Sequence, residues 1–207
     1  MSEQKLGHCL PLYLKNKLLL SALEDDDGLP VDAGEDMKVL AQFRERASDQ
    51  AVGLLEYLYA TLLGGTPSAV PYRSDRRSQR RTVREYWYVE GRLFRPKEKL
   101  SRAYWNIFLG CLRDQGPAVT FIVGPQDAAS PLAFDELADQ VATDLKLKSA
   151  NARSCFTHNA GYETGIVVSY APLAAGTSHK ELVKTMKDRL DGFFAKFRTQ
   201  LEAAIGS

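Results

Sequence analysis

The sequence predicts an α+β fold, with a mixed α/β arrangement as the alternative, built on a single sheet of about five strands with helices packed on it. Apolar residues follow helical spacing in the first 65 residues and again after residue 178. Between them lie short β-prone runs and one continuous apolar run bounded by turn residues. Helices and strands do not alternate regularly, which favours α+β. The 207 residues, 44% of them hydrophobic, suffice for a substantial core.

The chain divides into three parts by composition. Residues 1–65 form a helical N-terminal segment, 66–82 an Arg/Pro/Ser-rich connection, and 83–207 an α+β core. We expect the N-terminal helices to pack on this core as one domain.

Two helices are expected in the N-terminal segment. Residues 10–23 are leucine-rich, and the apolar residues of 35–63 recur at steps of three and four. Between the helices, residues 24–36 hold seven acids with two glycines and a proline, which is typical of an exposed loop. Gly64 and Gly65 end the second helix.

The middle of the chain predicts a hairpin, a helix and a buried strand. Two β-prone runs, 85–89 and 92–95, flank a two-residue turn at Glu90-Gly91. Apolar residues then follow helical spacing over 98–114, and Gly116 and Pro117 end that helix. Residues 118–124, AVTFIVG, are a short continuous apolar run and predict a central strand.

The last third predicts a helix, a second strand pair and a long C-terminal helix. Ser130-Pro131 is a good helix start, with a capping residue before proline. Residues 151–158 and 164–171 resemble two strands around a glycine-containing loop. Ser178 and Glu181 have the spacing of a capping box, and an apolar stripe runs from there to Ile205.

The net charge of the chain is only +1, so its overall composition does not favour electrostatic attraction to nucleic acid or membrane. No apolar stretch reaches the roughly 18 residues of a membrane helix. The first residues do not show the basic, apolar and small-residue regions that follow one another in a signal peptide. Three cysteines, an odd number, argue for reduced thiols. We therefore expect a cytoplasmic protein with no membrane association.

Charge is nevertheless segregated along the chain. Residues 72–102 hold eleven basic side chains, nine of them arginine, against four acidic ones, a net charge of +7, so the rest of the chain carries −6. Arginine suits bidentate contact with phosphate, and aromatic rings can stack on bases. The candidate residues for binding nucleic acid or another anion are Arg73, Arg76, Arg77, Arg80, Arg81, Arg84, Trp87, Tyr88, Arg92 and Arg95.

Residues 72–102 could instead have a purely structural role. The aromatic residues of 86–89 could pack beneath helices, since alternate strand residues face opposite sides. The arginines could pair with the acids of 24–36 or with a partner protein.

Enzymatic chemistry is the second interpretation. A metal-dependent hydrolase or nuclease would need carboxylates with a nearby lysine, and the alternative catalytic residues are Glu85, Glu90, Glu98, Lys99 and His158. Cys155 and His158, with His8-Cys9, are an alternative zinc set. Phosphate-binding glycine loops are absent from the sequence, and no cofactor is predicted.

Three hypotheses follow. The first is a non-enzymatic binding or accessory protein that contacts nucleic acid or an acidic protein partner through its arginine-rich segment. The second is the hydrolase or nuclease. The third is an assembly protein that forms homo-oligomers through its C-terminal apolar stripe and residues 57–63.

Overall fold

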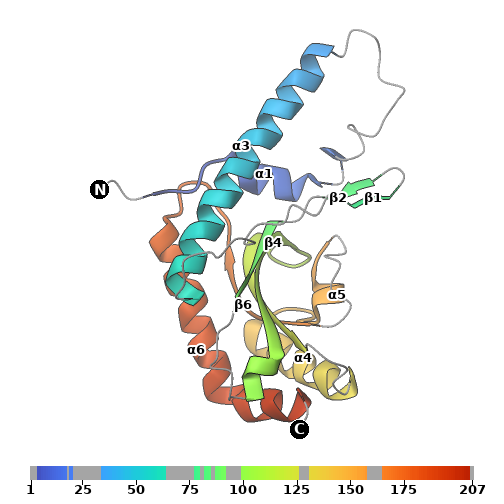
Figure 1. The fold of residues 1–207 in the computed structure, drawn as a ribbon, viewed down its shortest axis with the longest axis vertical. Helices are drawn as coiled ribbons and strands as arrows, with labels where there is room; N and C mark the ends of the chain where they lie inside the picture. Colours follow the sequence, from blue (N-terminus) through green and yellow to red (C-terminus); the bar gives the residue numbers. More distant parts are fainter. Residues whose placement is uncertain are drawn as a thin grey trace.

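A computed structural model confirms the α+β class (Figure 1). The structure describes residues 4–17, 19–20, 34–63, 77–79, 82–84, 87–91, 99–125, 131–157 and 165–205, and for some of these, including both short strands before residue 87, only the backbone. The main sheet has four antiparallel strands in the order β3-β4-β5-β6, and helices pack against it.

The N-terminal helices pack on one another and on the sheet. Helix α1 covers Cys9–Lys15, and α3 covers Gly34–Leu58 and continues as a π-helix, η1, over Tyr59–Leu63, so the predicted helix 35–63 is confirmed. The predicted helix 10–23 is interrupted at Asn16, and residues 21–33 lie outside the described part. The side chain of Gln50 on α3 accepts from the Leu10 N–H at 3.1 Å and joins the two helices.

Part of the expected connection 66–82 is a strand pair. Strand β1, Arg77–Gln79, pairs antiparallel with β2, Thr82–Arg84. Figure 1 shows this two-stranded ribbon to one side of the four-stranded sheet.

The predicted hairpin at Glu90-Gly91 is wrong. Strand β3, Trp87–Gly91, pairs with β4, Ala103–Leu112, with Trp87 opposite Leu109 and Gly91 opposite Trp105. Residues 92–98, the other expected arm, lie outside the described part. Glu90-Gly91 therefore ends a strand whose partner comes after a longer connection.

The predicted helix 98–114 is also wrong. After a short 3-10 helix, η2, at Lys99–Arg102, the chain forms strand β4. Every β4 residue except Tyr104 and Cys111 is buried, so both faces of the strand are covered. A strand buried on both faces reads as a continuous apolar run without period-two alternation. Its spacing therefore matched a helix by coincidence.

Strands β5, Gly116–Pro125, and β6, Ile166–Pro172, confirm two predicted strands. Gly116 does not end a helix; it follows the tight β4–β5 turn with φ +74°, a left-handed conformation that glycine adopts readily. Helix α4, Pro131–Leu145, begins where Ser130-Pro131 predicted.

The predicted strand 151–158 is wrong, because residues Ala152–Cys155 form a short helix, α5. The side chain of Asn151 accepts from the Arg153 N–H at 2.9 Å and caps it. The local hydrogen bond of the Asn151 side chain therefore favours a helix start over a strand at this position.

Helix α6, His179–Ala204, confirms the predicted C-terminal helix and its cap, with Ser178 Oγ accepting from the Glu181 N–H at 3.2 Å. It packs along the sheet (Figure 1), where Ser169 Oγ of β6 donates to the Met186 carbonyl at 2.7 Å. Its stripe is buried within the chain, at Leu182, Met186, Leu190, Phe193 and Leu201. The stripe thus packs mainly within the chain, and the third hypothesis, a homo-oligomer, stays a prediction.

One cluster of buried apolar side chains joins α1, α3, the four-stranded sheet, α4, α5 and α6, from Leu6 to Ile205. Among the described residues, no helix is both long enough and apolar enough to cross a membrane.

Candidate functional site

The β1–β2 ribbon carries Arg77 and Arg84, the two arginines of the predicted site that the structure describes. Its register sets Arg77 opposite Arg84 and Gln79 opposite Thr82. Because residues two apart in a strand share a face, these four residues fall on one face of the ribbon. The sequence places Arg80 and Arg81 between the strands. The other arginines of the predicted site lie outside the described residues: Arg73, Arg76, Arg80, Arg81, Arg92 and Arg95.

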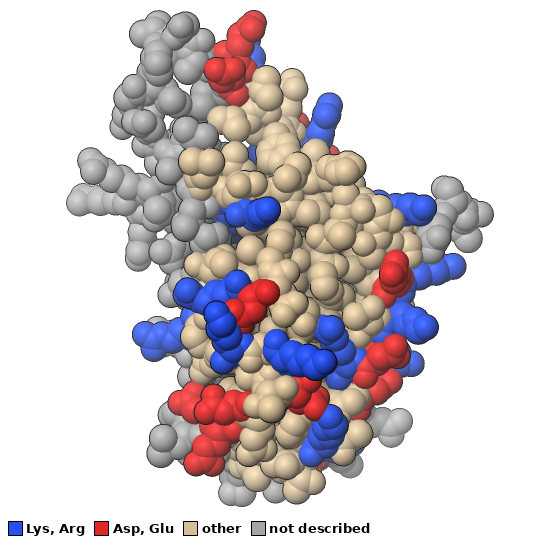
Figure 2. Space-filling view, turned by 180° about the vertical axis from the view of Figure 1, so that it is seen from behind, with Lys and Arg blue, Asp and Glu red and all other residues tan. Residues whose placement is uncertain are grey.

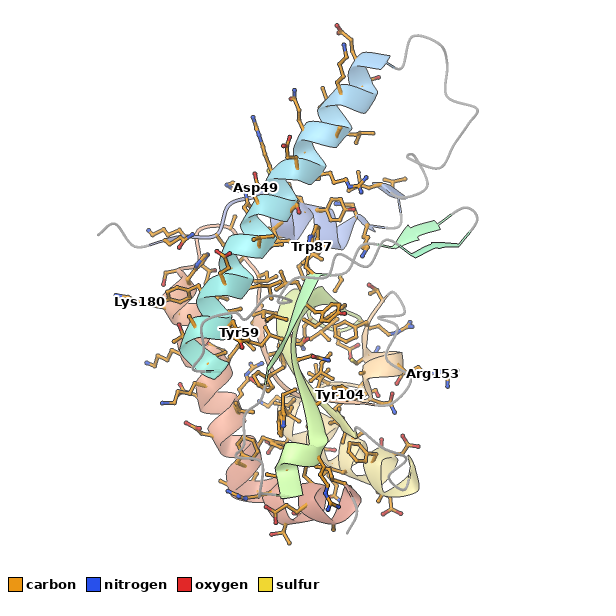
Figure 3. The ribbon with its side chains drawn as sticks, in the orientation of Figure 1. Asp49, Tyr59, Trp87, Tyr104, Arg153 and Lys180 are labelled. Carbon is orange, nitrogen blue, oxygen red and sulfur yellow. The ribbon has the colours of Figure 1, made fainter. Side chains whose placement is uncertain are left out.

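Trp87 is not available to stack on a base, so this part of the predicted site is wrong. Its side chain is 4% exposed and packs edge to face on Tyr13 of α1, with ring centroids 5.1 Å apart. In Figure 3 it lies just beneath α1. Tyr88, its neighbour in β3, is half-buried and also packs against the core. The structural interpretation of these two aromatic residues is therefore the better one.

The alternative catalytic set is not assembled within the described residues. The backbone places Glu90 opposite Asn106 in the sheet and Lys99 in η2. Glu85, Glu98 and His158 lie outside the described part of the chain, and the nuclease hypothesis stays a prediction.

Cys155 is a poor metal ligand or nucleophile. It is 5% exposed, and burial raises the pKa of its thiol to about 12. Metal binding and nucleophilic attack both require the thiolate. Where the chain is described, no three His, Cys, Asp or Glu residues are grouped so that they could hold a metal ion. Burial therefore disfavours the Cys155 thiolate, which is one of the two thiolates of the zinc alternative.

A cavity of about 410 Å³ lies where α4 ends beside β6 and α6. Its polar lining comes from the β4–β5 turn, the end of α4, β6 and the middle of α6: Gln115, Asp144, Lys146, Tyr170, Asp188 and Arg189. The sequence analysis did not identify this site. Its residues are far apart in the sequence, and only the isolated glycine at 192 inside a helical pattern could have signalled it.

Arg189 is held firmly in this cavity. Its Nη1 donates to the Tyr170 carbonyl at 2.8 Å, and its guanidinium carbon lies 3.8 Å from the centre of the Tyr170 ring. Stacking and hydrogen bonding fix the plane of the guanidinium.

Lys146 follows α4 in a left-handed conformation, with φ +57°. The Leu147 N–H donates to the Ala142 carbonyl at 2.9 Å, and the Lys146 N–H donates to the Thr143 carbonyl at 3.3 Å. These two bonds form a Schellman motif, in which this position is usually glycine.

An ion pair fixes the loop that carries Lys146. Asp114 accepts from the Lys148 N–H at 2.9 Å and pairs with the Lys148 ammonium at 3.3 Å. The backbone N–H of Lys148, with smaller contributions from the charges of Lys148 and Arg113, lowers the pKa of Asp114. The β4–β5 turn and the loop after α4, which form two walls of the cavity, are therefore joined.

Basic side chains are spread over the surface outside the arginine-rich segment. Figure 2 shows lysines and arginines in a band across the middle of one face, with acidic side chains among them and below. Arg153 and Lys180 point outward on opposite sides of the molecule (Figure 3). This mixed surface differs from the segregated charge of residues 72–102.

His179 is buried at the start of α6. Its backbone N–H donates to the Gln4 carbonyl at 3.0 Å, and its ring lies 5.4 Å from that of Tyr57 on α3. Its side chain is 4% exposed, its Nδ1 has no hydrogen-bond partner, and burial lowers the pKa of the imidazole. We assign it to packing and not to chemistry.

No protein-family model, curated protein or solved structure matches this chain.

Proposed function

We propose that this chain is a cytoplasmic, non-enzymatic protein that binds nucleic acid, and that the β1–β2 ribbon and its flanking arginines contact the phosphate backbone. Arg77 opposite Arg84 is the feature that most favours this function. Like charges directly opposite in a strand pair destabilise it by about 0.2 to 1 kcal/mol. A phosphate near both residues would reverse that repulsion.

The composition of the ribbon supports the same function. Its face with Arg77, Gln79, Thr82 and Arg84 holds only residues that can donate hydrogen bonds. A two-stranded ribbon fits the major groove of duplex DNA, and most protein–DNA hydrogen bonds go to phosphates and sugars. An isolated two-stranded hairpin is only marginally stable in water, so bound DNA would also stabilise the ribbon.

The binding test uses a fluorescein-labelled 20-base-pair duplex and anisotropy at 50 and 200 mM salt. Four phosphate contacts give a logarithmic salt slope of about −3.6, so affinity should fall about 10²-fold over this range. Replacing Arg77, Arg80, Arg81 and Arg84 by alanine should remove most of that slope and weaken binding at 50 mM salt by about the same factor.

A control variant removes the same number of charges elsewhere. Lys38, Lys180, Lys184 and Lys187 are exposed on α3 and α6, and alanine at these positions should leave the salt slope almost unchanged. If the control loses as much affinity as the arginine variant, net charge and not the ribbon governs binding. Binding to poly-L-glutamate without binding to DNA would favour an acidic protein partner instead.

A further inference from the structure

The cavity between α4, β6 and α6 has the size of a small-molecule site. Its volume, about 410 Å³, falls within the range of about 300 to 1,000 Å³ that ligand pockets occupy. It gathers side chains from elements far apart in the sequence, with Lys146 after α4, Tyr170 on β6 and Arg189 on α6. Such convergence of polar groups on one concavity is typical of ligand sites.

Only some of the charged side chains that line this cavity form salt bridges with other residues that the structure describes. Asp144 pairs with Lys196. Among the described residues, Arg189 and Lys146 form no salt bridge, and the same holds for Asp188. Two cations and one carboxylate are therefore available to a ligand.

The guanidinium of Arg189 is held in a position from which it can bind an oxyanion. The carbonyl and the ring of Tyr170 hold its guanidinium in place, and one hydrogen bond leaves several of its five donors unused. A guanidinium fixed in this way can donate two parallel hydrogen bonds to a carboxylate or phosphate.

Two further lining positions carry residues that are not the most stable choice for the fold. Lys146 occupies a left-handed position that favours glycine, and Gly192 occupies a helix interior that disfavours glycine. A side chain at Gly192 would meet nothing within 4 Å, so packing does not require glycine there. The left-handed backbone of Lys146 is of the kind that clusters at functional sites.

We propose that this cavity binds a small amphoteric molecule, with its carboxylate or phosphate held by Arg189 and Lys146 and its protonated amine held by Asp188. The cations provide the oxyanion contact, the open wall at Gly192 admits the ligand, and the Asp114–Lys148 ion pair holds the loop of Lys146 in place.

The probes are β-alanine and O-phosphoethanolamine, titrated against the ¹⁵N-labelled full chain by NMR. At least one should shift the backbone amides of residues 144–146 and 188–192 with a saturable dissociation constant. Inorganic phosphate and ethanolamine, each lacking one of the two groups, should bind about tenfold more weakly or not at all.

Two variants separate binding from folding. Gly192→Leu should place a bulky side chain at the open wall of the cavity and raise the helix propensity of α6, and Lys146→Gly should remove a cation and relieve the left-handed backbone. Both should therefore melt at or above the wild-type temperature, yet Gly192→Leu should abolish binding and Lys146→Gly should weaken it about tenfold. Lys187→Ala, an exposed α6 residue outside the cavity, should bind as the wild type does.

Saturable shifts at these amides that disappear in Gly192→Leu would support the site. Absence of shifts with both probes, or equal shifts in wild type and Gly192→Leu, would overturn it. Equal affinity for O-phosphoethanolamine and inorganic phosphate would overturn the role given to Asp188.

Discussion

At the scale of single residues, His179 has a pH-dependent effect on stability. Burial lowers the pKa of its imidazole in the folded chain, whereas the unfolded value is about 6.5. Between the lowered pKa and pH 6.5, the unfolded chain binds a proton that the folded chain does not. The contribution of neutral His179 is therefore complete above pH 6.5 and is lost as the pH falls toward the folded pKa.

Urea unfolding at pH 7.5 and pH 5.5 tests this expectation. The midpoint of the wild type should fall more between these two pH values than that of His179→Gln, which cannot titrate. The difference between the midpoint shifts of the two proteins separates the titration of His179 from that of the carboxylates. Parallel pH profiles would show that His179 does not titrate on unfolding in this range.

At the scale of elements, Tyr104 and Gly124 stabilise the β4–β5 pair as a unit. They lie directly opposite each other, and a Cβ atom at Gly124 would overlap the ring of Tyr104. The tyrosine ring thus covers a strand glycine, which shields the backbone there.

Gly124→Ala should destabilise the protein by about 1 to 3 kcal/mol, because the added methyl group displaces the Tyr104 ring. Gly53→Ala on α3 is the matched control. A Cβ there meets only the Gln4 side chain at 3.7 Å, so it should stabilise by about 0.5 to 1 kcal/mol. In a Tyr104→Ala background the cost of Gly124→Ala should largely disappear; equal costs in both backgrounds would contradict the contact.

Elements with local signals were predicted well from the sequence. The cap at Ser178, the start at Ser130-Pro131 and the stripe of α3 depend on neighbours within four residues, and all three are confirmed. The local pattern of strand β4 predicts a helix instead, because its burial on both faces depends on α1, α3 and Phe194 of α6, which no local pattern records. Trp87 was read as a binding residue because its contact with Tyr13 is equally remote in sequence.

The candidate sites divide in the same way. The arginines of residues 73–84 are contiguous, and their charge is evident from the sequence alone. The cavity requires Lys146, Tyr170 and Arg189 to meet through tertiary packing, so composition could not reveal it.

At the scale of the whole molecule, the N-terminal helices and the sheet share one apolar core. Tyr13 packs on Trp87, and Trp105 lies 5.7 Å from Phe121 of the sheet and 5.8 Å from Phe194 of α6. These are the only two tryptophans of the chain, and each reports on a different part of the core.

The two parts should therefore unfold together. In Trp105→Phe the fluorescence of Trp87 follows the N-terminal contact, and in Trp87→Phe the fluorescence of Trp105 follows the contact with α6. Each should melt within about 2 °C of the circular dichroism transition of the same variant, as a two-state unit does. An earlier transition of Trp87 alone would show that the N-terminal helices detach first.

The reactivity of the buried Cys155 thiol, finally, can report on local opening of the fold. Burial raises the pKa of this thiol to about 12, which disfavours the reactive thiolate at neutral pH, and it keeps alkylating reagents away from the sulfur. Modification must therefore wait until the region of α5 opens. The rate at which iodoacetamide labels Cys155 consequently measures how often this part of the fold opens, without an introduced cysteine.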